Sequence, residues 1–521
     1  MAANLSRTAQ LQVILGSSGV SFQDVIDVAR YGAKVAIAPE ASAAIIFSRK
    51  FIEEYAASDT PVYGVSTGFG ALANRHIAVE DRVQLQKSLI RSHAAGVGPA
   101  VETEVVRALM FLRLRTMASG RTGVRLKLAQ QYVDFLNSGI TPIVPEFGSL
   151  GCSGDLAPLS HCALAMMGEG RVHDASGEET PAVDALKAAG IQPLELEEKE
   201  GLALINGTDG MLGMLIMACA DLEQLCTVAD ITTAMSIEGL LGTDQVFAPE
   251  LHGPLRPQVG QTVSASNIFA MLKGSGIVAS HRENDSRVQD AYSLRCAPQV
   301  NGAVRDTISH ASTIAGRELA SSIDNPVVLP DGRVASNGNF HGAPVGYVLD
   351  FLAIAATDLG SMAERRTDRA LDHNRSAGLP PFLAHDPGVD SGLMIAQYTQ
   401  AGLVSENKRL ATPASVDSIP SSGMQEDHVS MGWSAARKLR KVVDNLARIL
   451  AIELVTSARA IEFRTGLTPA PATARVVAEL RKVVGGVGPD RYLSPELEAA
   501  VTLVNSGRIV AAAKEVVTNL A

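Results

Sequence analysis

The segment with the most evident chemical potential is Phe147-Gly-Ser-Leu-Gly-Cys-Ser-Gly-Asp-Leu-Ala-Pro-Leu-Ser-His161, in which a serine lies among glycines. A serine nucleophile elbow reads GxSxG, whereas here Gly151 and Gly154 bracket two residues, Cys152 and Ser153. A phosphate-binding loop ends in Lys followed by Ser or Thr, and this segment lacks that ending. One interpretation that stays open is a helix entry, in which Ser153 or Asp155 caps the helix and the glycines form a turn.

The other open interpretation is a cyclisation of residues 152 to 154. If the turn brings the amide nitrogen of Gly154 against the carbonyl carbon of Cys152, a ring can close, and loss of two waters leaves a methylidene group. Gly154 leaves the attack uncrowded and permits unusual backbone angles. Ser153 supplies the oxygen that leaves, and the small side chain of Cys152 does not hinder the ring. The product would be a strong electrophile held in the protein.

The same segment resembles the prosthetic-group loop of the aromatic amino acid lyases, the family of histidine, phenylalanine and tyrosine ammonia-lyases and related aminomutases. The resemblance implies a 4-methylidene-imidazol-5-one group formed autocatalytically from Cys152-Ser153-Gly154, with no added cofactor and no metal. The usual family triad is Ala-Ser-Gly, and this chain has Cys152 at the first position. Because that residue contributes only its carbonyl and Cα to the ring, we expect cyclisation to proceed.

Two tyrosines lie in loops that could serve an elimination. Removing ammonia from an amino acid requires a base beside the weakly acidic β-proton, and a phenolate would serve. Tyr63 lies in Pro61-Val-Tyr-Gly-Val-Ser-Thr-Gly-Phe-Gly70, and Tyr292 lies in Val288-Gln-Asp-Ala-Tyr-Ser-Leu-Arg-Cys296. Taken alone, either tyrosine would more often be a packing residue. The loops resemble the family patterns YGxxTGFG and QDxYSLRC, which implies that Tyr63 is the base and that Tyr292 acts near the prosthetic group.

Other residues are candidates for substrate contacts. Arg295 suits bidentate capture of a carboxylate, although a surface ion pair is the ordinary role of an arginine. Asn206 either caps the helix that follows it or, as the resemblance implies, contacts the prosthetic group and the substrate in catalysis. The resemblance also places Gln289 and Phe340 in the lining of the active site, while an aromatic residue such as Phe340 on a loop can equally be a packing plug.

Substrate choice depends on His93 and Glu426. His93, in Ser92-His-Ala-Ala-Gly96, resembles the ring-recognition position, where a neutral imidazole can bond a polar ring edge. The segment Met424-Gln-Glu-Asp-His-Val-Ser-Met431 resembles that of the histidine-specific members, with Glu426 facing the substrate imidazole. Burying a carboxylate against a benzene ring would cost several kcal/mol. Glu426, Asp427 and His428 are contiguous, so they lack the spacing of metal ligands on one helix face.

The resemblance runs from about residue 55 to 465 and implies non-oxidative elimination of ammonia from L-histidine, giving trans-urocanate, the first step of histidine degradation. A tyrosine ammonia-lyase or aromatic aminomutase, and a catalytically silent helical scaffold of the same fold, stay open as alternatives. Departures from the family pattern include Ala291 where Pro is usual, Asp209 where Gln is frequent, and Asn301. None of these departures removes a proposed catalytic group.

Long helices must position these loops. Aromatic residues make up only 4% of the chain, and apolar residues between Trp433 and Arg464 recur with helical spacing, without Gly or Pro. Further helices are expected over 101–117, 211–240 and 347–371, the second apolar on almost all sides. We therefore expect a mainly α fold, a long-helix bundle of the fumarase/aromatic amino acid lyase type with a loop-rich N-terminal active-site region. The expected regions are 1–210 with the prosthetic-group loop, 211–465 with the bundle, and 466–521 as a helical appendage.

Composition sets the remaining expectations. The chain of 521 residues is 46% hydrophobic and 19% charged, with a formal charge of −10, so nucleic acid is an unexpected partner. The N-terminus lacks a signal-peptide pattern, Asp221 ends the most apolar run, and five scattered cysteines form no disulfide pattern. We expect a cytoplasmic protein without membrane contact that binds a small amino acid. The resemblance implies a homotetramer with shared active sites.

Overall fold

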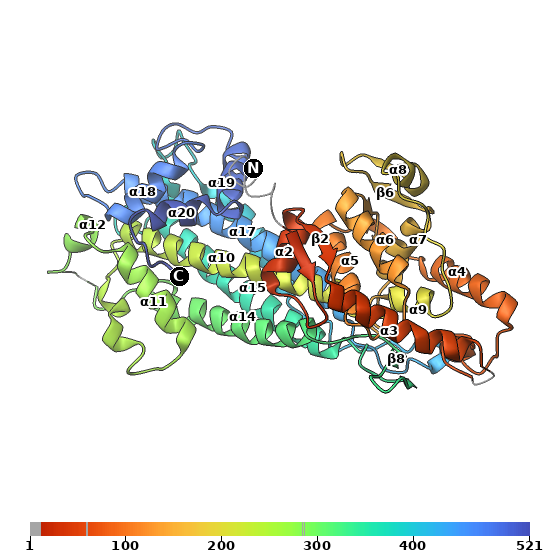
Figure 1. The fold of residues 1–521 in the computed structure, drawn as a ribbon. Coiled ribbons are helices and arrows are strands. Elements are labelled where there is room, and N and C mark those ends of the chain that lie inside the picture. The colour runs from red at the N-terminus through yellow and green to blue at the C-terminus, as the bar shows by residue number, and fades with distance from the viewer. Residues whose placement is uncertain (1–11, 59–60, 284, 286) are drawn as a thin grey trace. The chain divides into compact units, whose positions relative to one another are not determined.

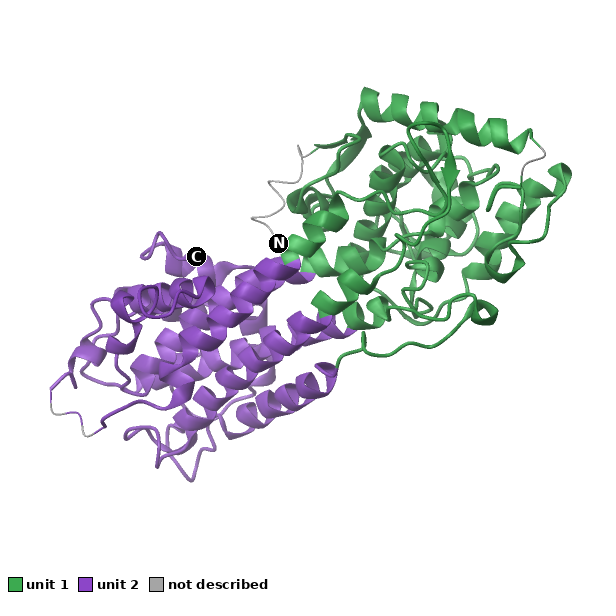
Figure 2. Cartoon of the chain, turned by 90° about the horizontal axis from the view of Figure 1, so that it is seen from below, with its two compact units in different colours: residues 1–217, 312–349, 413–437 green, residues 218–311, 350–412, 438–521 purple. Residues whose placement is uncertain are grey.

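The computed structural model describes residues 12–58, 61–283, 285 and 287–521 (Figure 1). Two compact units account for these residues, and Figure 2 distinguishes them by colour. Unit 1 comprises 1–217, 312–349 and 413–437, and unit 2 comprises 218–311, 350–412 and 438–521. Each unit is thus assembled from separate stretches, unlike the three consecutive regions expected from the sequence. Those regions remain a prediction about sequence organisation.

Unit 1 combines helices with short strands. Its helices are α2 (Phe22–Arg30), α3 (Pro39–Ala56), α4 (Arg82–His93), α5 (Thr103–Ala118), α6 (Leu126–Ser138), α7 (Leu156–Met166), α8 (Ala182–Ala188) and α9 (Glu200–Ile205), with short 3-10 turns η1 (Gly70–Leu72), η2 (Val79–Asp81) and η6 (Ser422–Met424). Helix α5 is buried from Val105 to Ala118 and packs against α2, α3 and α6. Helix α7 packs against α4 and α9. Helix α5 therefore forms the core around which the loops of unit 1 are held.

The strands of unit 1 form small separate sheets. Strand β1 (Gln12–Leu15) pairs in parallel with β2 (Lys34–Ile37), with Gln12 opposite Lys34. Strand β3 (Val97–Ala100) pairs antiparallel with β5 (Pro145–Phe147), and β4 (Thr141–Pro142), β6 (Arg171–His173) and β7 (Glu179–Pro181) form an antiparallel sheet in the order β4-β6-β7. Strands β8 (Val327–Val328) and β9 (Val334–Ala335) form a further antiparallel pair. These short strands tie together the loop-rich region expected from the sequence.

Long helices supply residues to both units. They are α10 (Asp209–Gly239), α14 (Ala297–Leu319), α15 (Ala343–Leu371) and α17 (Gly432–Glu462). The apolar face expected on α17 is confirmed, because Leu439, Val442, Leu446, Ile449 and Leu454 are all fully buried. The expected all-round burial of α10 is confirmed as well, since most of its residues are buried. The mainly α long-helix fold predicted from the sequence is therefore confirmed.

Unit 2 contains in addition α11 (Val259–Met271), α12 (Gly276–Ala279), α13 (Tyr292–Arg295), α16 (Met394–Leu410), α18 (Pro471–Leu480), α19 (Ser494–Asn505) and α20 (Arg508–Lys514), with 3-10 turns η3 (Gln245–Phe247), η4 (Pro249–Leu251) and η5 (Pro381–Leu383). A hydrophobic cluster joins α16 to α17 through Ala396 and Ile452. Buried Glu238 of α10 accepts hydrogen bonds from Ser275 (2.5 Å), the amide of Ala470 (2.7 Å) and Thr473 (2.5 Å). The C-terminal helices are thus fastened to the bundle by both apolar and polar contacts.

By length and hydropathy, α10 and α15 could each cross a membrane, so Asp221 does not shorten the apolar stretch of α10 as much as expected. Of the most apolar window of each helix, 78% in α10 and 61% in α15 is buried inside the protein. Core helices of a bundle have this composition because they are surrounded by other protein segments. Their apolar character is explained by packing.

Candidate active site

A cavity of about 550 Å³ within unit 1 gathers five of the residues singled out in the sequence. Its lining includes Tyr63, His93, Ser153, Asn206 and Glu426, which come from five separate stretches of the chain. A cavity of this size is in the range that holds a small-molecule ligand. The convergence of a phenol, an imidazole, an amide and a carboxylate around Ser153 makes this cavity the candidate active site.

The backbone at the Cys-Ser-Gly triad requires glycine. Gly154 has a φ of +80°, and a Cβ built there would lie 2.1 Å from the carbonyl oxygen of Gly207. Gly151 has a φ of +64°, and a Cβ there would lie 2.3 Å from the Ser430 hydroxyl. The triad is therefore pressed between two neighbouring segments in a left-handed turn that side chains would not permit. Cys152 is buried and Ser153 borders the cavity.

Asp155 fixes the triad to the core helix α10. Its carboxylate accepts hydrogen bonds from the Ser149 hydroxyl and from the amides of Gly210 and Met211, each at 2.9 Å. Burial raises the pKa of Asp155 to about 7, while these hydrogen bonds lower it. Asp155 does precede α7, as the helix-entry interpretation expects, but its side chain makes no bond to that helix. It caps the first turn of α10 instead, which ties residues 152–154 to the centre of the fold.

Tyr63 lies on the cavity wall, beside the backbone of Gly70 and the ring of Phe69. The amide of Gly70 donates a hydrogen bond to the Tyr63 phenol oxygen at 3.1 Å, and the Phe69 ring lies edge-on to the Tyr63 ring. Burial raises the pKa of Tyr63, the Gly70 amide lowers it, and the negative charge of Glu426 raises it. The amide of Gly70 therefore offsets part of the burial cost of the phenolate.

His93 and Glu426 contribute an imidazole and a carboxylate to the cavity wall. His93 ends α4, and burial lowers its pKa, so the ring is held neutral. Glu426 accepts a hydrogen bond from Ser421 at 2.7 Å through one carboxylate oxygen and from Ser153 at 3.3 Å through the other. A neutral imidazole and an oriented carboxylate in one cavity are suited to a ligand ring that carries N–H groups.

Asn206 keeps an acceptor available. Its side-chain amide donates to the carbonyl of Asn325 at 2.8 Å, and its own backbone carbonyl accepts from Arg113 at 2.7 Å. Its side-chain oxygen is buried and has no partner within the described part of the chain. Asp155, and not Asn206, caps α10, so the capping interpretation of Asn206 is wrong. A buried acceptor without a partner in the protein points to a bound group as its donor.

Arg113 belongs to a buried network of charges that holds Asn206 and Asn325. Its second terminal nitrogen donates to the Ile323 carbonyl at 2.7 Å, and Lys199 bonds Asp324 at 2.6 Å, with both of these side chains fully buried. The residues around Asn325 are therefore held by ionic contacts. Replacing either Lys199 or Asp324 would leave the other with an unpaired buried charge.

Apart from Cys152 and Gly154, which flank Ser153, the structure leaves four predicted residues out of the cavity lining. Gln289, Tyr292 and Arg295 belong to unit 2, and Tyr292 is 70% exposed. The guanidinium carbon of Arg295 lies 4.6 Å from the centre of the Tyr292 ring, and no ion pair involving Arg295 occurs among the described residues. Phe340 belongs to unit 1 but is not among the lining residues of the cavity. The site roles of these four residues stay predictions.

Several lining residues have no counterpart in the sequence-based prediction. Asn325, Ser422 and Leu202 border the cavity, and none of them was singled out from the sequence. The segments 324–344 and 412–424 are rich in Gly and Pro, as loops that carry functional residues often are, and this is the available signal for Asn325 and Ser422. Leu202 lies inside the short helix α9 and offers no chemical signal, because apolar lining residues look like ordinary core residues.

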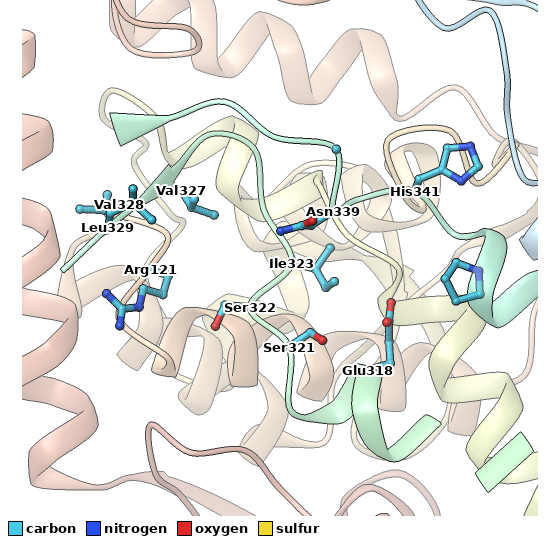
Figure 3. A pocket seen from close by; sticks show the side chains of 12 residues that line it. Arg121, Glu318, Ser321, Ser322, Ile323, Val327, Val328, Leu329, Asn339 and His341 are labelled. Atoms are coloured by element: carbon cyan, nitrogen blue, oxygen red, sulfur yellow. The ribbon is translucent and has the colours of Figure 1, made fainter. Parts of the chain in front are cut away.

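A second cavity of about 680 Å³ in unit 1 was also not anticipated (Figure 3). Arg121, Glu318 and His341 bring opposite charges and an imidazole to its wall, together with serines and the apolar side chains around β8. It contains none of the predicted catalytic residues. The candidate active site remains the cavity at Ser153.

The chain matches known proteins over nearly its full length. The family described as "aromatic amino acid lyase" matches residues 20–482. The chain belongs to the aromatic amino acid lyase family. Among family members it is similar to the histidine ammonia-lyase of Streptomyces griseus, with 67% identity over 98% of this chain and 99% of the relative. The histidine ammonia-lyase of Streptomyces coelicolor is 65% identical over 97% of this chain and 98% of the relative.

Solved structures of family members share the fold. A tyrosine aminomutase from Streptomyces globisporus superimposes with a TM-score of 0.91 at 38% identity, covering 96% of this chain and 98% of that chain. The histidine ammonia-lyase from Trypanosoma cruzi superimposes with a TM-score of 0.89 at 37% identity, covering 97% and 96%. The family predicted from the sequence motifs is therefore confirmed, together with its helical lyase fold.

Proposed function

We propose that this chain eliminates ammonia from L-histidine to give trans-urocanate. The observation that carries the proposal is the cavity at Ser153, where the neutral imidazole of His93 and the carboxylate of Glu426 converge. The relatives named histidine ammonia-lyase, at 65–67% identity, support the same substrate. An imidazole side chain offers a ring N–H that can donate a hydrogen bond to the carboxylate of Glu426.

The residues at 152–154 fit the prosthetic group that the family motif implies. Gly154 occupies a left-handed turn against Gly207 that excludes any side chain, and Ser153 borders the cavity. Asn206 lines the same cavity, and its side-chain oxygen is buried without a partner among the described residues. The 4-methylidene-imidazol-5-one group would be made from Cys152, Ser153 and Gly154, and it would supply an electrophile that activates the substrate amine as a leaving group.

The chain's own side chains account for the remaining steps. Glu426 accepts a hydrogen bond from the substrate imidazole and orients it, and Asn206 accepts one from the substrate amine. Tyr63, as phenolate, removes a proton from the β-carbon while the bond from the α-carbon to nitrogen breaks, so that a carbon–carbon double bond and ammonia are formed. When the substrate fills the cavity it displaces water, and the lower local dielectric constant strengthens these polar contacts.

Arg295, Gln289, Tyr292 and Phe340 enter the proposal through oligomerisation. We infer a homotetramer with shared active sites, in which these residues reach the cavity of another copy and Arg295 binds the substrate carboxylate. The 70% exposure of Tyr292 supports this inference, because an exposed aromatic side chain at a functional motif is typical of an interface. We also place the protein in the cytoplasm.

A tyrosine-specific lyase or aminomutase is the second candidate. The observation in its favour is the fold similarity to a tyrosine aminomutase, which is 38% identical to this chain. The identity to a histidine ammonia-lyase is higher, at 67%. The carboxylate of Glu426 argues against a phenol ring as the usual ligand, because an imidazole can carry a positive charge beside it whereas a phenol cannot. A catalytically silent scaffold is a third reading, and its prediction is an unmodified Ser153.

The test combines product analysis with intact mass. Purified protein is incubated with L-histidine and, separately, with L-tyrosine, and products are identified by ultraviolet absorbance and mass spectrometry. We expect urocanate from histidine, and an intact mass lower than the sequence mass by two waters. The variant Ser153→Ala should keep the full mass and lose turnover. Consumption of tyrosine with histidine untouched would refute the substrate, and an unmodified mass in inactive protein would favour the scaffold.

A further inference from the structure

The segment that carries Tyr292 and Arg295 has little support of its own. Helix α13 is a single turn, and such a turn is not stable without tertiary contacts. Tyr292 is 70% exposed, so burial does not hold its side chain. The spacing of three residues puts Tyr292 and Arg295 on one face, with the guanidinium carbon 4.6 Å from the ring centre. Contacts from outside α13 must therefore hold Tyr292 and Arg295 in position.

Arg366 contacts the backbone of α13. One terminal nitrogen of Arg366 donates to the carbonyl of Ser293, the residue that follows Tyr292, at 3.2 Å. The other two nitrogens bond both carboxylate oxygens of Glu453, at 2.5 and 3.0 Å. Both side chains are fully buried. Because the guanidinium is a rigid plane, the two bonds to Glu453 set the direction of the third, toward Ser293.

The carboxylate of Glu453 accepts two further hydrogen bonds. It accepts hydrogen bonds from Thr232 at 2.8 Å and Ser236 at 2.9 Å, both on α10. Arg366 lies on α15 and Glu453 on α17, so side chains of three long helices meet at this carboxylate. The three helices α10, α15 and α17 are labelled in Figure 1. A carboxylate with four bonds has its lone pairs satisfied and cannot rotate away. The position of Arg366 is thereby fixed by the bundle.

The start of the same segment has an independent anchor. Asp290 accepts a hydrogen bond from the amide of Thr243 at 2.8 Å and lies 3.5 Å from Arg287. Both anchors hold the segment without using the side chains of Tyr292 and Arg295, and the Nε of Arg295 is buried without a partner among the described residues. The reactive side chains thus stay available while their backbone is held.

We propose that Arg366, clamped by Glu453, is a positioning residue for Tyr292 and Arg295. The inference rests on the proposed function, in which Arg295 binds the substrate carboxylate. Arg366 transmits the rigidity of the bundle to α13 through the Ser293 carbonyl. Loss of that bond displaces the turn, and a displacement of about 1 Å at a substrate-binding group can lower the rate about 100-fold.

Two variants separate positioning from stability. Arg366→Lys keeps a cation for Glu453, but a single ammonium cannot hold Glu453 bidentately and reach Ser293 as well. The double variant Arg366→Met with Glu453→Met removes both charges, which avoids an unpaired buried ion. The matched control is the double variant Lys438→Met with Asp350→Leu, which likewise removes both charges of a pair. Lys438 of α17 bonds Asp350 of α15 at 2.8 Å and so links the same two helices without contacting α13.

The assays are the rate of urocanate formation, thermal unfolding and intact mass. We expect kcat/KM for histidine to fall about 100-fold in Arg366→Lys and in the Arg366/Glu453 double variant, with the mass loss of two waters retained. The Arg366/Glu453 double variant should unfold near the wild-type temperature. Preference for histidine over histidinamide, which lacks the carboxylate charge, should shrink in both Arg366 variants and not in the Lys438/Asp350 control. A purely structural pair would leave this preference unchanged.

The proposal is overturned if the Arg366/Glu453 double variant folds and keeps wild-type kcat/KM, if Arg366→Lys keeps the wild-type preference, or if the Lys438/Asp350 control loses as much activity. Failure of the proposed function is visible separately, because wild-type protein would then form no urocanate. In that case the same variants are compared on the amino acid that the wild type does convert, and an unchanged rate in Arg366→Lys again overturns the positioning role.

Discussion

Replacing Glu426 tests substrate recognition and base activation together. In the structure its carboxylate accepts from Ser421 and Ser153, and its charge raises the pKa of Tyr63 and of His93. Glu426→Gln keeps an acceptor in place and removes only the charge. Glu426→Ala removes the acceptor as well, and it leaves the Ser421 hydroxyl without its partner. The two variants therefore separate the effect of charge from the effect of the hydrogen bond.

The expected magnitudes follow from hydrogen-bond energetics. A hydrogen bond to a charged group contributes about 1.5–3 kcal/mol and a neutral one about 1 kcal/mol. Glu426→Gln should thus lower kcat/KM for histidine about tenfold, and Glu426→Ala about 10- to 150-fold, at about 1.4 kcal/mol for each factor of ten. Steady-state rates of urocanate formation measure both. Discrimination against phenylalanine should fall in parallel, since the buried carboxylate disfavours a benzene ring.

The dependence of kcat on pH should also change in Glu426→Gln, and in a direction that favours the base. Tyr63 acts as base only when deprotonated, and Glu426 raises its pKa, so the active form gains population as the pH rises. Removing the negative charge lowers the pKa of Tyr63, and the rising limb of kcat against pH should move to lower pH in Glu426→Gln. Wild-type kcat/KM in Glu426→Ala, or a rising limb displaced to higher pH in Glu426→Gln, would refute this account of the site.

Three further changes probe the base, the triad and the core. Tyr63→Phe should lower kcat by about 10²- to 10⁴-fold, with the intact mass unchanged from wild type, as expected for loss of a general base; a normal rate would exclude Tyr63. Gly154→Ala places a Cβ 2.1 Å from the Gly207 carbonyl oxygen at a φ of +80°, so mass spectrometry should find no loss of water from soluble protein. Lys199→Met leaves Asp324 buried without its partner and should reduce the free energy of unfolding by about 3–5 kcal/mol, measured by denaturant titration; full stability would contradict the buried pair.

The long helices were predictable where their patterns are uninterrupted. Apolar periodicity located α17 and α10 within a few residues, because neither contains proline and the apolar positions repeat along the helix. Helix α14 was not predicted, since Pro298 and two glycines interrupt its sequence. Pro298 lies in the first turn, where proline is tolerated because the amide there needs no partner. A local pattern rule discounts such a helix, whereas packing in the bundle stabilises it.

The site was predictable to the extent that it depends on residue type within motifs. Tyr63, His93, Ser153, Asn206 and Glu426 were named from the sequence, and they line one cavity. Their supports were not foreseen, because each is a contact between distant segments. Asp155 illustrates this: its neighbours in sequence predict a cap for α7, but the amides that it bonds belong to α10, more than fifty residues away. Sequence spacing describes only local partners.

Gly70 connects Tyr63, the proposed base, to the loop of residues 421–426, which carries Glu426. Its amide bonds Tyr63, and a Cβ at residue 70 would lie 2.8 Å from the Ser422 hydroxyl, next to backbone in the left-handed region at Ser422, Gly423 and Met424. The two loops are thus fitted to each other without spare room. A lineage that altered residue 422 to accept a new ring would also disturb the group that takes the proton. Ring preference and proton abstraction in this protein therefore have to evolve as one trait.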